Sequence, residues 1–134
     1  MYSIFKSELT AKSEYDGLFK DQYSRYINIV ALARQAQLEE FYKVPIDKLE
    51  EEGYTLSIAT AHINFIRKIK TDEALIVQTQ LDNFSGGACN INFWIYKKDN
   101  QKLAADGYFV YVLTSLKSNM TVQFPKELKE KLSI

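Results

Sequence analysis

Few side chains in this sequence combine a type that does acid–base or nucleophilic chemistry with a suggestive setting. Asp16 lies in the stretch Tyr15-Asp16-Gly17, just ahead of a long helical pattern. A carboxylate at such a place could act as a general base or a nucleophile. An Asp-Gly pair is also typical of a simple turn. From the pattern alone, the turn is the simpler interpretation of Asp16.

The single histidine and the single cysteine have no sequence neighbours that mark a catalytic site. His62 lies in a strand pattern, where a lone histidine is more often structural, although it could line a pocket. Cys89 has no nearby histidine to activate its thiol, so we interpret it as a small apolar residue. One Cys and one His exclude an internal disulfide and a Cys/His zinc site.

A small basic cluster follows the strand pattern that contains His62. Arg67, Lys68 and Lys70 flank Ile69 in a largely charged connection. Such a cluster would suit phosphate groups. It is equally typical of a solvated loop, and from the residues alone the loop is the simpler interpretation.

The element that must position these groups is a helix predicted from Gln22 to Tyr42. Its apolar residues recur mostly at spacings of three and four, no Gly or Pro interrupts it, and Asp21 or Ser24 can cap it. One helix cannot bury its own apolar stripe, so it needs a broad partner surface. The predicted stripe comprises Tyr23, Tyr26, Ile27, Val30, Ala31, Ala33, Leu38, Phe41 and Tyr42.

The remaining chain has mostly strand patterns that could supply that surface. We expect a short strand within Ser3 to Lys12, a helical turn from Pro45 to Gly53, and a short closing helix after Pro125. Apolar alternation and β-favouring residues predict the other strands. These strands cover residues 54–65, 74–81, 89–96, 103–114 and 120–124, with turns at 84–87 and at Asp99-Asn100.

Length and composition predict a single α+β domain over residues 1–134, with a long helix against a curved antiparallel sheet of about five to six strands. Cystatin-like folds share that description, and periodicity does not choose between them. Seventeen basic residues balance 17 acidic ones, which argues against nucleic-acid binding. Charges in the first residues argue against a signal peptide, and no apolar run would span a membrane. We therefore expect a soluble cytoplasmic protein.

Three stretches of the sequence resemble the hot-dog thioesterase superfamily, in its 4-hydroxybenzoyl-CoA thioesterase branch. DGLFKDQYSRYINIVALAR, from Asp16 to Arg34, resembles a family loop and helix with D-x-x-G-H-V-x-N, Y-L-x-Y and A-R, matched by Tyr26, Ala33 and Arg34. TAHINFIRKIKTDEALIVQTQL resembles the family's strands, with Phe65 and Arg67 between them. NFWIYKKDNQKLAADGYFVYVL resembles the final hairpin of that group.

The resemblance implies a hot-dog fold, assembly into a homodimer or tetramer, and active sites at the dimer interface near the start of the long helix. The implied function is hydrolysis of acyl-CoA or a related acyl thioester, without a metal or other cofactor. The resemblance also implies residue roles: Asp16 as general base or nucleophile, backbone N–H groups of Tyr23 and Ser24 as oxyanion donors, Tyr26 and His62 in the substrate pocket, and Arg67 and Lys68 at CoA.

The chain departs from the family pattern in the loop before the helix. Phe19, Lys20, Asp21 and Tyr23 stand where relatives often carry Gly, His, Val and Asn, and Ala31 stands where some carry Glu. A protonated Lys does not replace an imidazole near neutral pH. The alternative function is therefore a catalytically eroded hot-dog protein that binds acyl thioesters without turnover. A hot-dog dehydratase ranks last, because His62 is not placed as those motifs require.

Overall fold

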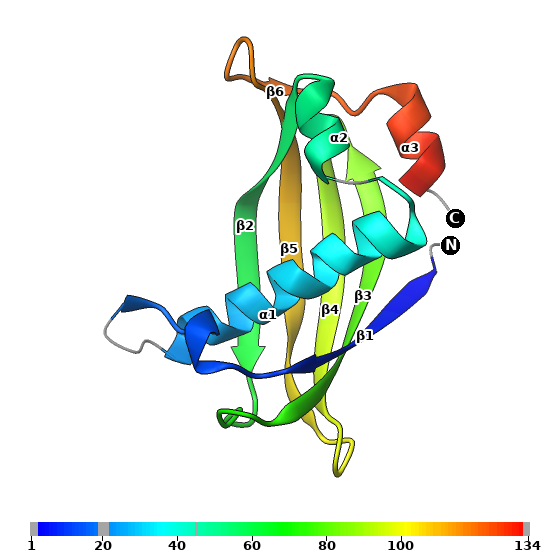
Figure 1. Ribbon diagram of the computed structural model, residues 1–134. Helices are drawn as coiled ribbons and strands as arrows, with labels where there is room; N and C mark the ends of the chain where they lie inside the picture. The colour runs from blue at the N-terminus through cyan, green and yellow to red at the C-terminus, as the bar shows by residue number, and fades with distance from the viewer. Residues whose placement is uncertain (1–2, 19–21, 45, 133–134) are drawn as a thin grey trace.

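The computed structural model describes residues 3–18, 22–44 and 46–132. Figure 1 shows the elements in chain order. The helical elements are η1 (Ser13–Tyr15), α1 (Gln22–Ala36), the π-helical segment η3 (Gln37–Phe41), α2 (Ile46–Glu51) and α3 (Lys126–Leu132). The strands are β1 (Ile4–Thr10), β2 (Tyr54–Phe65), β3 (Ala74–Ser85), β4 (Ala88–Lys97), β5 (Leu103–Ser115) and β6 (Thr121–Val122).

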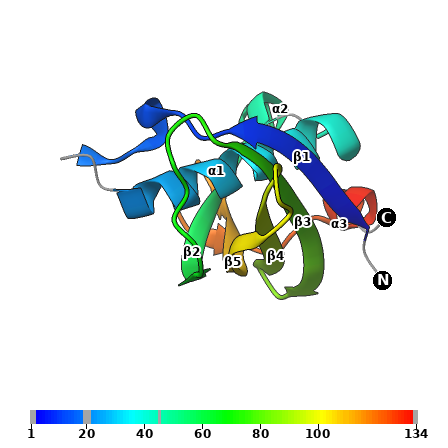
Figure 2. The same ribbon diagram turned by 90° about the horizontal axis from the view of Figure 1, so that it is seen from below.

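The strands form one six-stranded sheet in the order β1-β3-β4-β5-β2, with the short β6 paired to β5. All the strand pairs in this sheet are antiparallel. Helix α1 crosses one face of the sheet diagonally, and the sheet curves around it (Figures 1 and 2). This architecture confirms the predicted α+β class with a long helix against a curved antiparallel sheet.

Strands β2 and β3 are consecutive in the chain but are not neighbours in the sheet. β2 forms one edge, and β3 lies beside the opposite edge strand β1. The chain between them, residues 66–73, therefore crosses one end of the sheet. Its start is fixed there because the backbone N–H groups of Ile66 and Arg67 both donate to the carbonyl of Ala104. This crossing segment carries the basic cluster found in the sequence.

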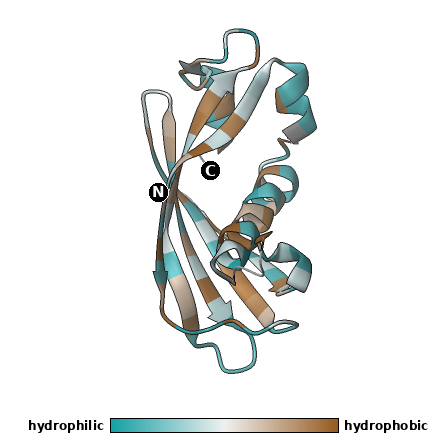
Figure 3. Ribbon diagram, turned by 90° about the vertical axis from the view of Figure 1, so that its left-hand side faces the viewer, coloured by the Kyte–Doolittle hydropathy of each residue, from teal (hydrophilic) through white to brown (hydrophobic). Residues whose placement is uncertain are grey.

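The core lies between α1 and the inner face of the sheet, and hydrophobic residues alternate with polar ones along the strands (Figure 3). On α1 the buried apolar residues are Tyr26, Ile29, Val30 and Ala33. The predicted stripe was wrong in part, because Tyr23 is 65% exposed and Ile27 38% exposed. The buried face of a helix with 3.6 residues per turn covers only part of its circumference. The apolar residues of this helix extend beyond that part, so some of them face solvent.

A bulge in β2 changes which of its residues face the helix. The pairing with β5 shifts between Ile58 and Thr60, so Ala59 is the extra residue. Ile58 pairs with the inner-face residue Tyr111 before the bulge, whereas Ala61 pairs with the inner-face residue Phe109 after it. The simple alternation predicted for residues 56–64 is therefore wrong beyond the bulge.

The described part of the chain contains no helix that is long and apolar enough to cross a membrane.

Gly107 allows β5 to pass close to β2, and it gives a first testable prediction. Its φ is +154°, and a Cβ atom there would overlap the backbone carbonyl of His62 and lie 3.1 Å from the Phe93 ring. We expect Gly107→Ala to lower the free energy of unfolding by about 3 kcal/mol or more. Urea unfolding measures this change.

Gly86→Ala is the matched control. Gly86 also has a positive φ, but a Cβ there would meet nothing within 4 Å. Its cost should be that of the backbone conformation, about 1 kcal/mol. Equal losses for the two variants would contradict a steric role for Gly107.

Candidate functional site

Asp16 forms a two-point ion pair with Arg25 of α1. Arg25 Nε donates to Asp16 Oδ1 at 2.5 Å, and Arg25 Nη2 donates to Asp16 Oδ2 at 2.8 Å. The Arg25 side chain is 3% exposed and the Asp16 side chain 11% exposed. Both carboxylate oxygens are therefore engaged by one guanidinium in a largely enclosed place.

The same guanidinium also holds the crossing segment 66–73. Arg25 Nη1 donates to the carbonyl of Ile69 at 2.8 Å, and Nη2 donates to Thr71 Oγ1 at 2.9 Å. Asn28 adds a bond from the next turn of the helix, donating to the carbonyl of Tyr15 at 2.6 Å. Three segments distant in the sequence are thus joined: the turn at Asp16, the first half of α1, and the segment between β2 and β3.

Tyr26 fixes the crossing segment from the neighbouring helix position. Its hydroxyl donates to the carbonyl of Arg67 at 3.1 Å and accepts from the N–H of Ile69 at 3.2 Å. Burial raises the pKa of this phenol, so the hydroxyl keeps its proton and remains a donor near neutral pH. Tyr26 was predicted to line the substrate pocket. The structure shows its hydroxyl positioning the segment that carries the basic cluster.

The environment of Asp16 favours its ionised form. The hydrogen bonds from Arg25 lower the pKa of the Asp16 carboxyl below its usual value, and the charge of Arg25 adds to this effect. A carboxylate with a lowered pKa is a weaker base, because general-base efficiency follows basicity. It is nevertheless fully ionised at neutral pH, as a nucleophile or a group that orients water must be. The catalytic role of Asp16 stays a prediction.

The start of α1 carries an exposed aromatic ring, Tyr23, that contacts Phe65 of β2. Tyr23 and Ser24 lie in its first turn, where backbone N–H groups point toward the helix N-terminus. The Tyr23 ring meets the Phe65 ring edge-on at 5.0 Å, and Phe65 is itself 48% exposed. The predicted cap Asp21 and the family departures Phe19 and Lys20 lie outside the described residues.

The predicted CoA-binding residues Arg67 and Lys68 are exposed and lie on the crossing segment. Arg67 Nη1 donates to the carbonyl of Leu103 at 2.6 Å. The backbone carbonyl of Lys68 accepts a bond from Lys97 Nζ at 2.7 Å. Because Arg25 and Tyr26 hold this segment against α1, the basic cluster lies beside the turns of the helix that hold Asp16.

The position of His62 follows from the bulge in β2. The bulge in β2 places it on the outer face of the sheet, paired with Tyr108 and stacked on that ring at 5.2 Å and 14°. It does not line the space between α1 and the sheet, and its predicted place in the substrate pocket stays a prediction. Helix α1 covers the opposite face of the sheet (Figure 1), so a role for His62 beside Asp16 in the same protomer is not supported.

Arg25 is the site residue that sequence reasoning missed. The sequence patterns gave Arg25 no role, yet it is only 2% exposed. The available signal was its spacing, because Arg25 precedes Ile29 by four positions and therefore shares the buried face of the helix. A second buried arginine, Arg34, shares the same signal and is 3% exposed. In the described ranges, no three His, Cys, Asp or Glu side chains gather as they would around a metal ion.

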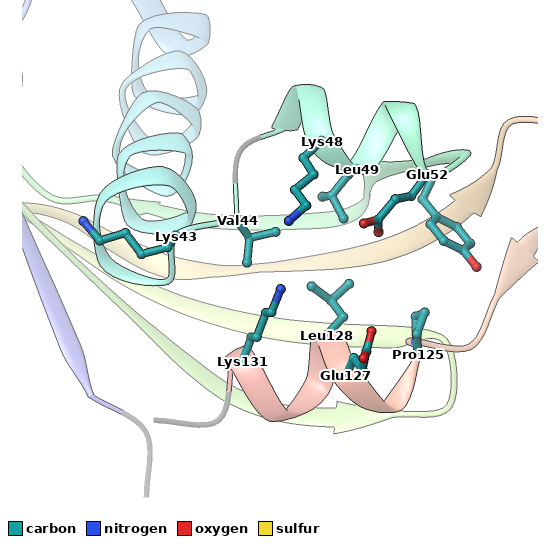
Figure 4. Close-up of a pocket in the computed structure, with 10 residues that line it drawn as sticks. Lys43, Val44, Lys48, Leu49, Glu52, Pro125, Glu127, Leu128 and Lys131 are labelled. Atoms are coloured by element: carbon teal, nitrogen blue, oxygen red, sulfur yellow. The ribbon is translucent and has the colours of Figure 1, made fainter.

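Cavities elsewhere in the described structure lie apart from Asp16. Figure 4 shows a small one of about 60 Å³ between α2 and α3, where Lys48 and Lys131 face each other across Leu49 and Leu128. A hollow of about 470 Å³ lies on the outer face of the sheet, beside Asn90. A cavity of about 250 Å³ lies between α1 and β2, beside Arg34.

Comparison with known proteins identifies the family of this architecture. Residues 21–132 match the model of the thioesterase-like superfamily. No curated protein matches the sequence. The architecture described above is therefore the hot-dog fold that the sequence resemblance implied.

Solved structures support the same fold at low sequence identity. A 1,4-dihydroxy-2-naphthoyl-CoA thioesterase from Synechocystis superposes with a TM-score of 0.83 at 15% identity, covering 97% of this chain and 96% of that one. A DHNA-CoA thioesterase from Staphylococcus aureus superposes with a TM-score of 0.82 at 16% identity, covering 97% of this chain and 87% of that one. A further Staphylococcus aureus protein, solved in complex with CoA, superposes with a TM-score of 0.78 at 14% identity, covering 98% of this chain and 82% of that one.

The lowered pKa of Asp16 predicts how stability depends on pH. Because the folded-state pKa lies below the unfolded value of about 3.9, the ion pair contributes its full stability above that value. This contribution is lost as the pH falls through the folded pKa. We expect Asp16→Asn to be destabilising at neutral pH, and its difference from wild type to shrink below about pH 4.

Urea unfolding at a series of pH values measures this difference. Glu8→Gln is the control, since the Glu8–Lys98 pair is exposed and should contribute little at any pH. A difference between wild type and Asp16→Asn that stays constant as far down as both proteins remain folded would contradict the assigned pKa direction.

Proposed function

We propose that this chain, which belongs to the thioesterase-like superfamily, is an acyl-CoA thioesterase that releases a free acid and a thiol. The observation that carries the proposal is the joint placement of Asp16 and the basic crossing segment. Arg25 and Tyr26, at consecutive positions of α1, tie both of them to the same turn of the helix. One carboxylate and a cluster of exposed cations are therefore held near one helix end.

Asp16 would act as an ionised carboxylate. In one route its oxygen attacks the thioester carbonyl, the C–S bond breaks and the thiolate leaves, and water then hydrolyses the resulting anhydride. In the other route the carboxylate orients and deprotonates a water molecule for direct attack. Both routes pass through a tetrahedral oxyanion. The backbone N–H groups of Tyr23 and Ser24, at the positive end of the helix dipole, are the proposed donors to it.

The CoA phosphates would be held by Arg67 and Lys68, with Lys70 close to them in the chain. These side chains are exposed at the end of the sheet, beside α1, and guanidinium and ammonium groups are the usual phosphate partners. Two of the similar structures belong to CoA-thioester hydrolases, and a third was solved with CoA. These three structures support CoA thioesters as the proposed class of substrate. Because their sequence identity to this chain is low, they leave the acyl group undefined.

A homodimer formed through β2 fits the exposure of that edge. β2 has no strand beyond it in the sheet, and its middle residues, 57–62, are all exposed. Ile58, Phe65 and the helix residue Ile27 are respectively 42%, 48% and 38% exposed. Pairing two β2 edges would continue the sheet and cover this apolar surface. Two such dimers would make the tetramer.

A second function is favoured by one observation, namely that Arg25 occupies both oxygens of Asp16. A carboxylate committed to structure would leave a protein that binds acyl thioesters without hydrolysing them. Turnover separates the two functions, because both predict binding of acyl-CoA.

Hydrolysis of a panel of short, long and aromatic acyl-CoAs, followed by thiol release, tests the proposed activity. We expect at least one substrate to be cleaved, and Asp16→Asn to lower kcat by about 100-fold or more. Wild type that binds acyl-CoA and cleaves none of the panel would overturn hydrolysis in favour of binding alone.

Arg25→Met separates a chemical role of Asp16 from its structural one. This variant breaks the same ion pair but keeps the carboxylate. At matched folded fraction, Asp16→Asn should lose far more activity than Arg25→Met if the carboxylate reacts or activates water. Equal losses would show that Asp16 acts only by holding Arg25.

The dimer is tested by placing a charge on its proposed surface. We expect Ile27→Asp to shift the protein from dimer to monomer, because a carboxylate would be desolvated in the interface. Ile4→Asp is the matched control, since Ile4 is 50% exposed on β1 at the opposite edge of the sheet. Sedimentation velocity measures both variants, and a monomeric wild type across a wide concentration range would contradict the dimer.

A further inference from the structure

The cavity of about 250 Å³ beside Arg34 is lined by an unusual combination of groups. Its walls are mainly apolar and come from α1, η3, α2, β2 and β5, through Ala31, Leu38, Leu49, Leu56, Ile58 and Tyr111. The polar side chains in its lining are Arg34, Gln35 and Thr55. The lining therefore contains one cation and no acid among the described residues.

Arg34 is buried without a compensating charge. In the part of the chain that the structure describes, Arg34 forms no ion pair. Its Nη1 donates to Gln37 Oε1 at a long 3.3 Å, and its Nε has no described hydrogen-bond partner. The contrast with Arg25 is direct, because Arg25 is equally buried and makes four hydrogen bonds, two of them to a carboxylate.

The groups nearest to Arg34 supply no negative charge at neutral pH. Its guanidinium lies 5.5 Å from the centre of the Tyr111 ring. Burial raises the pKa values of Tyr111 and Cys89 to about 12, so both remain neutral. Burial also lowers the pKa of Arg34, yet a guanidinium keeps its proton in proteins. A buried cation with donors to spare beside a cavity favours the binding of an anion there.

We propose that this cavity binds the carboxylate of a small apolar organic acid, which Arg34 holds while the apolar walls enclose the hydrocarbon part. Guanidinium groups match carboxylates in geometry and charge. A volume of about 250 Å³ suits a short-chain or single-ring acid and is too small for CoA.

The cavity is distinct from the Asp16 site. Arg34 lies nine positions beyond Arg25 on α1, which is about 14 Å along the helix axis. The exposed residue Gln35 lies at its border, so a ligand can enter from solvent at the α1 side, away from the β2 edge proposed for the dimer. The proposal concerns binding and holds whether or not the protein hydrolyses thioesters.

The test is calorimetric titration of the full chain with hexanoate and benzoate, and with hexanamide and benzamide as uncharged isosteres. We expect the acids to bind and the amides to bind at least about 10-fold more weakly, since hydrogen bonds to a charged partner are the stronger kind. Amides that bind as tightly as the acids would overturn the proposal.

Two variants locate the site. Arg34→Met should weaken acid binding by about 10- to 100-fold and should leave the protein as stable as wild type or more stable, because it removes an uncompensated buried charge. Ala31→Leu fills the cavity without touching the cation and should also abolish binding. The control Lys102→Met removes an exposed cation elsewhere and should change nothing.

Other outcomes overturn the proposal. Unchanged acid binding in Ala31→Leu would place the acid outside this cavity. A loss of both stability and dimer in Arg34→Met, with no acid binding by wild type, would mean that Arg34 pairs across subunits.

The source of the carboxylate follows from comparing adipoyl-CoA with hexanoyl-CoA. Tighter binding of adipoyl-CoA that Arg34→Met removes indicates a distal acyl carboxylate, and no such preference indicates a free acid.

Discussion

The buried guanidinium of Arg25 is the constraint on which the site depends. A buried cation must find acceptors, and Arg25 finds them on two segments: the Asp16 carboxylate in the turn before α1, and the Ile69 carbonyl and Thr71 hydroxyl in the crossing segment. Both segments are irregular, and Tyr26 and Asn28 add further hydrogen bonds that fix them against the helix. The position of the candidate carboxylate and the path of the basic crossing segment are thus consequences of satisfying one buried side chain.

The same constraint sets the chemistry of Asp16. The pairing that fixes the carboxylate also lowers its pKa and occupies its oxygens. The ion pair that holds the Asp16 carboxylate in place therefore also makes it a weaker base, although it keeps the carboxylate ionised. This competition is why hydrolysis and turnover-free binding both remain physically sensible functions for a member of this superfamily.

The two buried arginines of α1 differ in how many hydrogen-bond acceptors surround their guanidinium groups. Arg25 has a full set of protein acceptors and works as a structural centre. Arg34 has one long hydrogen bond to Gln37 and a cavity beside it, and the anion that we propose for it is an organic carboxylate. Helix α1 thus carries a buried ion pair in its first half and a buried cation beside a cavity in its second half.

The sequence by itself determined the fold class and the elements, because strong 3.6- and 2-residue periodicities extend along most of the chain. It also determined the family, through three stretches between Asp16 and Leu113 that resemble it. It located Asp16, Tyr26 and the Arg67–Lys68 cluster, but it did not determine how they are joined. The tertiary structure decided that Arg25 is buried, because only packing selects one face of an apolar-rich helix. It also decided that His62 faces away from the helix, because a single bulge at Ala59 exchanges the two faces of β2. Such features depend on contacts between distant segments, which local sequence patterns do not contain.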